Sequence, residues 1–229
     1  RSGLAATGNS NFGYFGGGGI FPTPKSIVDR IDYSNDTGTA SPKGPLSSAR
    51  SYLAATGNSN FGYFGGGYLP TTAKVQRIDY SSDTATAVEK GPLSVAKNSL
   101  AATGNSNFGY FGGGLFHPAK YSTVDRIDYS SDTGTTPSKG PLSVARRGLS
   151  ATGNSSFGYF GGGEPVPSGA TVDRIDYSND TATAAVKGPL SIGRKDVGAS
   201  SAAANALPTN TGNIETFIAS TDPRDNVVP

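Results

Sequence analysis

One block of sequence occurs four times in the chain, and this repetition limits the possible folds more than any other feature. The block Leu-Ala-Ala-Thr-Gly-Asn-Ser-Asn-Phe-Gly-Tyr-Phe-Gly-Gly-Gly begins at Leu4 and recurs from Leu53, from Leu100 and, with two serine replacements, from Leu149. A second block, Arg-Ile-Asp-Tyr-Ser, and a third, Lys-Gly-Pro-Leu-Ser, follow it in every copy. Copies 47 to 49 residues apart in constant register indicate one structural unit repeated as an array.

The pattern inside each copy is typical of β-strands and turns. Two large rings alternate with glycine from Phe12 to Tyr14. From Val28 to Tyr33 successive side chains would fall on opposite faces of a strand, with Asp29, Ile31 and Tyr33 on one face. Clusters of Gly, Asn, Ser and Pro separate these runs, and no helical period is sustained. We therefore predict four strands in each unit and an all-β chain. One unit has too few large apolar side chains to offset the entropy of ordering it, so neighbouring units are expected to share their cores.

The repeat resembles the kelch repeat of β-propellers, whose blades are four-stranded sheets around a central channel. Tyr14-Phe15-Gly16-Gly17 matches the double glycine of that repeat with its preceding large residues, and Tyr33 followed by Thr37 matches its tyrosine and threonine. The stretch from Pro45 to Arg50 is similar to its proline, leucine and arginine stretch. The usual tryptophan is replaced in the four copies by Ala40, Ala87, Thr136 and Ala184. The resemblance implies a kelch-like propeller whose blades pack through Phe and Tyr.

The expected organisation is four blades and a divergent end. We place the repeats at about 1–49, 50–96, 97–145 and 146–194, because Arg1 aligns with Arg50, Lys97 and Arg146. Residues 195–199 still fit the first strand of a fifth unit, and Ile214 to Ala219 is a further candidate strand. Segment 195–229 is thus expected to be a partial blade or a closing or exchanging tail. Without methionine, Arg1 is not a translation start, so we expect a processed product or part of a longer chain.

The ends of the array leave three architectures open. The units can close a small ring of four or five blades, belong to a larger ring, or form an open array. In an open array, unpaired end strands would associate between chains.

Composition argues against most chemistry and several partners. Nineteen basic and 17 acidic side chains give a net charge of only +2, so we expect no nucleic acid and no anionic membrane as partner. No apolar run is long enough for membrane insertion. Cysteine is absent and His117 is the single histidine, which removes thiolate metal sites, cysteine nucleophiles and a repeated Ser-His-Asp arrangement. We predict no catalytic residue, no cofactor and no metal, and treat Ca²⁺ at the repeated Asp29, Asp32 and Asp36 as the alternative.

Residues identical in every copy are expected to build the scaffold. The Phe12, Tyr14 and Phe15 rings at strand spacing predict the shared core, while Gly16 and Gly17 would end the strand and allow close packing. We expect Arg30 to pair with aspartates, including those of neighbouring blades. Asp32 is expected to pair with Arg30, and Asp36 to cap its own turn. The full scaffold prediction is Phe12, Tyr14, Phe15, Gly16, Gly17, Arg30, Asp32 and Tyr33.

Variation between copies is concentrated in one segment per unit, after the triple glycine. These segments are residues 19–27, 68–74, 115–123 and 164–171, and the unit repeat places them on one face of the assembly. Exposed aromatic residues there are candidates for partner contacts, although drift in an unconstrained loop is the simpler interpretation. The candidate contact residues are Phe21, Lys25, Tyr68, Leu69, Phe116, His117, Tyr121 and Glu164.

These observations favour a non-enzymatic structural or assembly protein. The amino-acid sequence of the repeats is similar to that of repeat regions in virion structural proteins of marine cyanophages. This resemblance implies a virus-particle or extracellular fibre component. The implied partners are other copies of the chain or other virion or fibre proteins. A lectin-like module that binds a surface glycan through the variable loops is the alternative. A hydrolase or lyase with the aspartates as acid and base is a third hypothesis, and equivalent copies in every unit argue against it.

Overall fold

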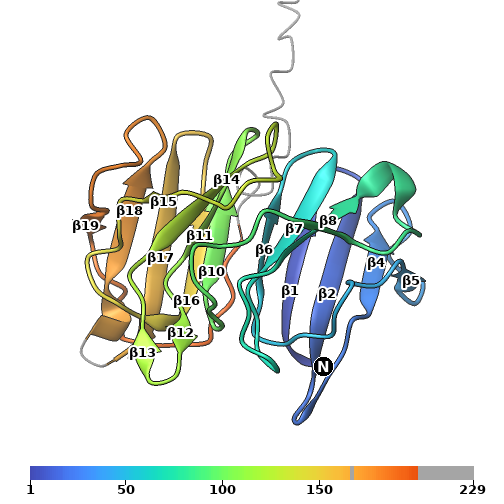
Figure 1. Cartoon of the computed structure of the whole chain (residues 1–229), viewed down its shortest axis with the longest axis horizontal. Coiled ribbons are helices and arrows are strands. Elements are labelled where there is room, and N and C mark those ends of the chain that lie inside the picture. The colour runs from blue at the N-terminus through green and yellow to red at the C-terminus, as the bar shows by residue number, and fades with distance from the viewer. Residues whose placement is uncertain (166–167, 201–229) are drawn as a thin grey trace, which may run out of the picture.

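The chain folds into four antiparallel β-sheets, one from each repeat, arranged as a four-bladed β-propeller (Figure 1). The computed structural model describes residues 1–165 and 168–200. The predicted all-β propeller of four-stranded blades is confirmed. Two short 3₁₀ turns, η1 (Tyr80–Ser82) and η2 (Ser168–Ala170), are the only helical elements in the described part.

In each blade the four strands of the sheet lie side by side in the order in which they occur in the chain. Blade 1 also carries a fifth, two-residue strand on the second strand, and blade 3 has a small separate hairpin in its variable loop. Blade 1 contains β1 (Ser2–Gly8), β2 (Phe12–Ile20), β3 (Thr23–Pro24), β4 (Val28–Asp32) and β5 (Ser41–Lys43). Blade 2 contains β6 (Ala54–Gly57), β7 (Phe61–Gly65), β8 (Val75–Asp79) and β9 (Val88–Lys90). Blade 3 contains β10 (Ala101–Gly104), β11 (Phe108–Gly112), β14 (Val124–Asp128) and β15 (Ser138–Lys139), with the hairpin of β12 (Leu115–Phe116) and β13 (Ala119–Lys120). Blade 4 contains β16 (Arg147–Gly153), β17 (Phe157–Glu164), β18 (Val172–Asp176) and β19 (Ala185–Lys187).

The register inside the blades repeats from copy to copy. In blade 1 the second-strand residue Tyr14 lies opposite Thr7 on one side and Arg30 on the other. The turn before it is held by Asn9, whose side-chain oxygen accepts hydrogen bonds from the backbone N–H groups of Asn11 and Phe12. An asparagine that satisfies its own turn in this way fixes where the second strand begins.

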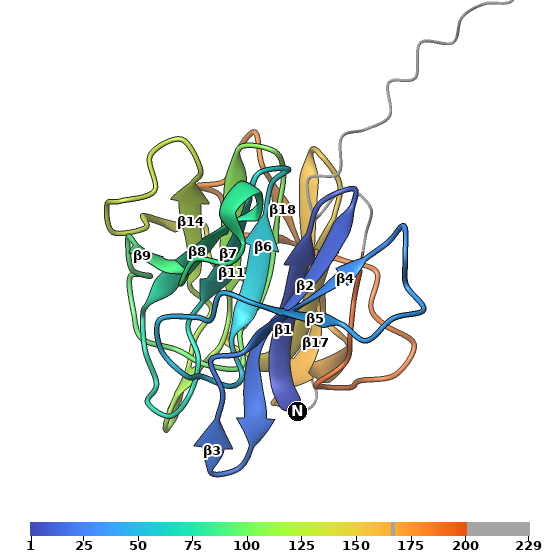
Figure 2. The same cartoon turned by 90° about the vertical axis from the view of Figure 1, so that its right-hand side faces the viewer.

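The first strands of successive blades lie side by side around the centre of the molecule. β1 packs beside β6, β6 beside β10, and β10 beside β16, and Figure 2 shows β6 of blade 2 beside β1 and β2 of blade 1. At the start of these strands, backbone hydrogen bonds of 2.7 to 2.8 Å run from Tyr52 N to Gly3 O, from Ser99 N to Tyr52 O and from Gly148 N to Ser99 O. Asp196 N continues the series to Gly148 O at 2.8 Å. The chain after blade 4 therefore begins a fifth position in the ring.

The hydrophobic cores lie between blades rather than inside them. Tyr14, Val28 and Leu46 of blade 1 form one buried cluster with Phe64 and Ile78 of blade 2. Equivalent clusters join blade 2 to blade 3 and blade 3 to blade 4. The units thus share their cores, as the shortage of large apolar side chains in one unit led us to expect.

Segment 195–200 lies where the first strand of a fifth blade would lie. Besides the bond from Asp196, Thr152 Oγ1 donates a hydrogen bond to Ser200 O at 3.1 Å, and the Ser150 hydroxyl donates to Val197 O. All six residues of the segment are exposed. The candidate strand from Ile214 to Ala219 lies outside the described residues.

Candidate functional site

The three internal blade interfaces share one polar network, centred on a buried aspartate. Asp83 of blade 2 accepts hydrogen bonds from the Tyr14 hydroxyl at 2.9 Å and from Arg30 Nη1 at 2.7 Å, both on blade 1. Lys43 Nζ lies 3.5 Å from the other carboxylate oxygen. The next interfaces repeat the set with Asp132, which binds Tyr63, Arg77 and Lys90, and with Asp180, which binds Tyr110, Arg126 and Lys139. We call this set the interface network.

The network confirms one sequence-based expectation and corrects two. Arg30 does pair with an aspartate of the neighbouring blade. Asp32 was expected to pair with Arg30, but its carboxylate caps its own turn by accepting from the Ser34 backbone N–H at 2.9 Å and the Ser34 hydroxyl at 2.6 Å. Asp36 was expected to be the cap, yet the residues at its repeat position in later blades pair with the preceding blade. Asp32 is the last residue of its strand, so its carboxylate lies beside the backbone of the following turn. The aspartate four residues later, represented by Asp83 in blade 2, lies at the surface that contacts the preceding blade.

Aromatic rings reinforce each interface. The Tyr14 ring stacks on Tyr80 of the next blade with centroids 4.7 Å apart, and the Tyr80 hydroxyl lies 3.1 Å from Thr7 Oγ1. The same stacks join Tyr63 to Tyr129 and Tyr110 to Tyr177. Burial raises the pKa of Tyr177 to about 12, so its hydroxyl keeps its proton at neutral pH. Phe12, predicted as core, is half-buried and carries the Arg30 guanidinium 4.1 Å above its ring.

A buried basic residue at the start of each later repeat is a structural feature that sequence reasoning missed. Arg50, Lys97 and Arg146 are at most 1% exposed. Lys97 pairs with Asp125 at 2.9 Å and Arg146 with Asp173 at 2.6 Å, all with unexposed side chains. The signal was present in the alignment of basic residues at the repeat boundaries.

Arg50 differs from the other two buried basic residues because its partner is neutral. Its Nη2 donates to the Gln76 side-chain oxygen at 2.9 Å, and its Nη1 donates to Lys74 O at 3.0 Å. Burial lowers the pKa of Arg50 to about 10. Gln76 in this one copy thus replaces a carboxylate beside a buried cation.

The lowered pKa values of two aspartates indicate that the folded protein is less stable in acid. Burial alone would raise the pKa of Asp132, but hydrogen bonds from Lys90 and Tyr63 and the charges of Arg77 and Lys90 hold it below its usual value. The Ser34 hydroxyl, followed by its backbone N–H, likewise lowers the pKa of Asp32. Carboxyl groups with lowered folded pKa values stabilise the protein above their unfolded pKa of about 3.9, and this contribution is lost as pH falls through the folded values.

We therefore expect the free energy of unfolding, measured by urea denaturation, to fall steadily as pH drops below about 4. A free energy that stays level from pH 5 to pH 2 would contradict these assignments.

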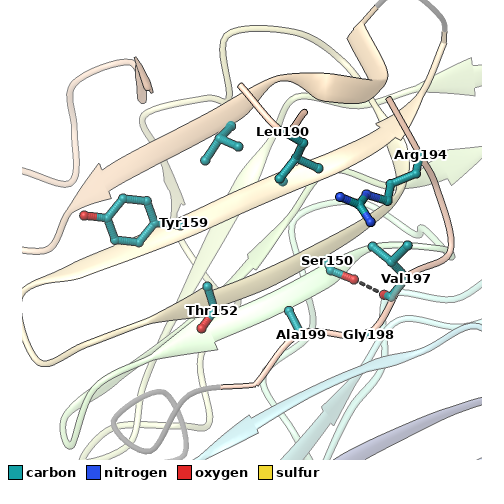
Figure 3. A pocket seen from close by; sticks show the side chains of 10 residues that line it. Ser150, Thr152, Tyr159, Leu190, Arg194, Val197, Gly198 and Ala199 are labelled. Carbon is teal, nitrogen blue, oxygen red and sulfur yellow. Dashed lines mark hydrogen bonds between the residues drawn. The ribbon is translucent and has the colours of Figure 1, made fainter. Parts of the chain in front are cut away.

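Blade 4 exposes one half of the interface network with no partner in the described part of the chain. Tyr159 and Val172 are half-buried, whereas their counterparts Tyr14 and Val28 are completely buried. Neither Arg174 nor Lys187 forms an ion pair within residues 1–165 and 168–200. A cavity of about 240 Å³ lies between blade 4 and segment 197–199. Figure 3 shows Tyr159, Leu190 and Arg194 on one side of it and Val197, Gly198 and Ala199 on the other. We call this surface, formed by Tyr159, Gly161, Val172, Arg174, Lys187 and Leu190, the blade-4 face.

Blade 1 exposes the other half. Tyr33 is 55% exposed, whereas Tyr80 at the same repeat position is 9% exposed. Phe15 is half-buried although its counterparts in the later blades are fully buried, and Asp36 is exposed with no ion pair among the described residues. We call the surface of Phe15, Tyr33 and Asp36 the blade-1 face. These residues were predicted as scaffold or turn, and their position at the end of the array distinguishes them.

The variable loops bring four of the eight candidate contact residues together. Phe21, Tyr68, Phe116 and His117 border a hollow of about 530 Å³ that also contains Tyr52. Phe21 is 75% exposed and Phe116 is 51% exposed. The other candidates do not border it. Leu69 and Tyr121 are half-buried, Lys25 is exposed, and Glu164 binds Arg147 and Lys195.

Within 1–165 and 168–200, no three His, Cys, Asp or Glu side chains gather as a possible metal site. In the same part of the chain, no helix is long and apolar enough to cross a membrane. No protein-family model and no curated protein matches the chain.

Proposed function

We propose that this chain is a non-enzymatic structural protein, a kelch-type propeller that assembles through its blade faces into a virion or an extracellular fibre. The observation that carries the proposal is the pair of exposed faces at the ends of the blade array. The blade-4 face offers a tyrosine and two cations, Arg174 and Lys187, and the blade-1 face offers an aspartate and a tyrosine. Each face is one half of a contact that the molecule already makes three times internally.

The use of the carboxylates supports a structural rather than a catalytic role. Asp83, Asp132 and Asp180 occupy equivalent positions and each is bound by one tyrosine and two cations. A catalytic centre generally needs one asymmetric site in which acid and base have different environments. Here the same environment is repeated, and its partners serve to hold neighbouring blades.

The test is the mass of the native protein in solution, measured by light scattering over a range of concentrations. The proposal predicts species heavier than one chain, and the fraction of the protein in these species should increase with concentration. A mass equal to one chain at every concentration, with no partner captured from its source, would contradict it.

A second candidate function is supported by the loop hollow. We propose as the alternative that Phe21, Tyr68 and Phe116 bind a surface glycan, because exposed aromatic rings around a hollow suit the apolar faces of sugars. Joint replacement of these three residues by alanine is expected to abolish binding on a glycan array. The control is Val88→Ala on blade 2, which removes an exposed side chain outside the loops. A wild-type protein that binds no glycan would remove this candidate.

A further inference from the structure

We infer that the blade-4 face of one molecule binds the blade-1 face of a second copy of the same chain, head to tail. This inference rests on the proposed assembly function and names its partner and its contact residues. Each group left without a partner on one face has its complement on the other, in the arrangement seen at the internal interfaces.

The aromatic groups are the first complement. At the internal interfaces, the ring at the Tyr14 position stacks on the ring at the Tyr80 position of the next blade. Tyr159 holds the first of these positions on the blade-4 face, and the exposed Tyr33 holds the second on the blade-1 face. Docking would place the Tyr33 ring on Tyr159, completing a fourth stack.

The charged groups are the second complement. Arg174 and Lys187 stand at the repeat positions of Arg30 and Lys43, which bind Asp83. Asp36 stands at the repeat position of Asp83 and is exposed. A second copy would bring Asp36 to Arg174, Lys187 and the Tyr159 hydroxyl, so that two unpaired cations and one unpaired carboxylate satisfy one another.

Shape is the third complement. A Cβ atom placed on Gly16, Gly65 or Gly112 would lie 2.5 to 2.6 Å from a phenylalanine ring of the next blade. The same atom on Gly161 would meet nothing closer than Val172 at 3.6 Å. Likewise a Cβ atom placed on Gly44, Gly91 or Gly140 would collide with a backbone carbonyl oxygen of the next blade, whereas one placed on Gly188 would meet nothing within 4 Å. The blade-4 face therefore has room for the Phe15 ring and for the turn of an incoming blade.

Segment 195–200 now covers part of this face and must leave when a second copy binds. It follows the path that β1 of the incoming blade would take, because Asp196 N bonds to Gly148 O as Tyr52 N bonds to Gly3 O. Its residues are exposed and few described hydrogen bonds hold it. A contact between unlike faces gives a closed ring or an open filament. Two copies that each use both faces would close a ring of eight blades, at the upper end of the common range.

The test uses one variant for each face. Asp36→Lys places a third cation opposite Arg174 and Lys187, so it blocks the blade-1 face. Gly161→Ala places a methyl group where the Phe15 ring would lie, so it weakens the blade-4 face. The control is Ser131→Lys, which also places a lysine in an exposed blade turn, here in blade 3 and with a charge change of one unit rather than two.

Sedimentation is expected to show twice the chain mass for the wild type and for the control. Asp36→Lys should remain a single chain. Gly161→Ala should associate about 10- to 100-fold more weakly, a loss of about 1.4 to 2.8 kcal/mol that lies within the usual cost of overpacking. An equimolar mixture of the two variants should form mixed pairs, because each supplies the face that the other has lost. These pairs show that both variants are folded.

Two results would overturn the inference. If the wild type associates and both variants associate equally well, the contact lies elsewhere and only the assembly function survives. If the variants fail to associate and their mixture also fails, complementary faces are not the cause. A wild type that stays a single chain contradicts the proposed function itself.

Discussion

Replacing Asp132 with alanine is expected to lower the free energy of unfolding by about 3 kcal/mol, because breaking a buried ion pair leaves its partner charges uncompensated. The Asp132 carboxylate is bound by Tyr63 at 2.9 Å, Arg77 at 2.8 Å and Lys90 at 3.0 Å, and its side chain is 7% exposed. Equilibrium denaturation in urea measures the change. The loss is expected near the lower end of the usual range for buried pairs, because water still reaches part of Arg77.

The matched control is Asp36→Ala, which removes the same side chain from the same repeat position in blade 1. Asp36 is exposed and forms no ion pair in the described part of the chain, so the change in unfolding free energy should stay within about 0.5 kcal/mol. Both measurements are made at a concentration where the protein is a single chain. Equal losses for the two variants would show that the interface network does not hold the blades together.

Gly112→Ala is expected to destabilise the protein by about 2 to 3 kcal/mol, within the usual cost of overpacking a core. The new Cβ would lie 2.6 Å from Cε1 of Phe160, and this ring is fully buried between blades 3 and 4. Neither Gly112 nor Gly161 has a positive φ, so a backbone preference for glycine adds nothing at either position. The midpoint of urea denaturation measures the difference.

Gly161→Ala is the matched control, since it changes the same residue of the same repeated block at the end of the array. The nearest atom to the new Cβ is Val172 Cγ2, at an ordinary contact distance of 3.6 Å. We expect a change of less than about 0.5 kcal/mol in the unfolding free energy of the single chain. A large loss at Gly161 would mean that another segment already occupies the blade-4 face.

The repetition of the sequence was sufficient to predict the fold. The alternation around Tyr14 and Ile31, with Gly and Asn between the runs, predicts strands joined by turns. The shortage of large apolar side chains in one unit predicts cores shared between blades, and the structure places Tyr14 and Phe64 in one such core. The strands and the shared cores could be predicted because they depend on the local residue pattern and on the number of large apolar side chains, and both can be read from the sequence.

The roles of the polar residues were harder to predict. Asp32 and Asp36 lie four residues apart in the same turn, and their sequence neighbours do not show which one faces the preceding blade. Only the rotation between blades brings Asp83 to Arg30 and Tyr14. The same limit applies to the ends, because Phe15 and Phe64 have identical sequence surroundings and differ only in whether a blade precedes them.

The most direct test of the account is zero-length carbodiimide coupling of the wild-type protein, followed by mass spectrometry of the two-chain band. This reagent joins a lysine to a carboxylate that it touches, so the pairs Lys43 to Asp83, Lys90 to Asp132 and Lys139 to Asp180 serve as internal controls. If the end faces bind each other as the internal faces do, the two-chain band will also contain Lys187 joined to Asp36. A two-chain band that contains the three internal links but lacks this fourth link would contradict the account.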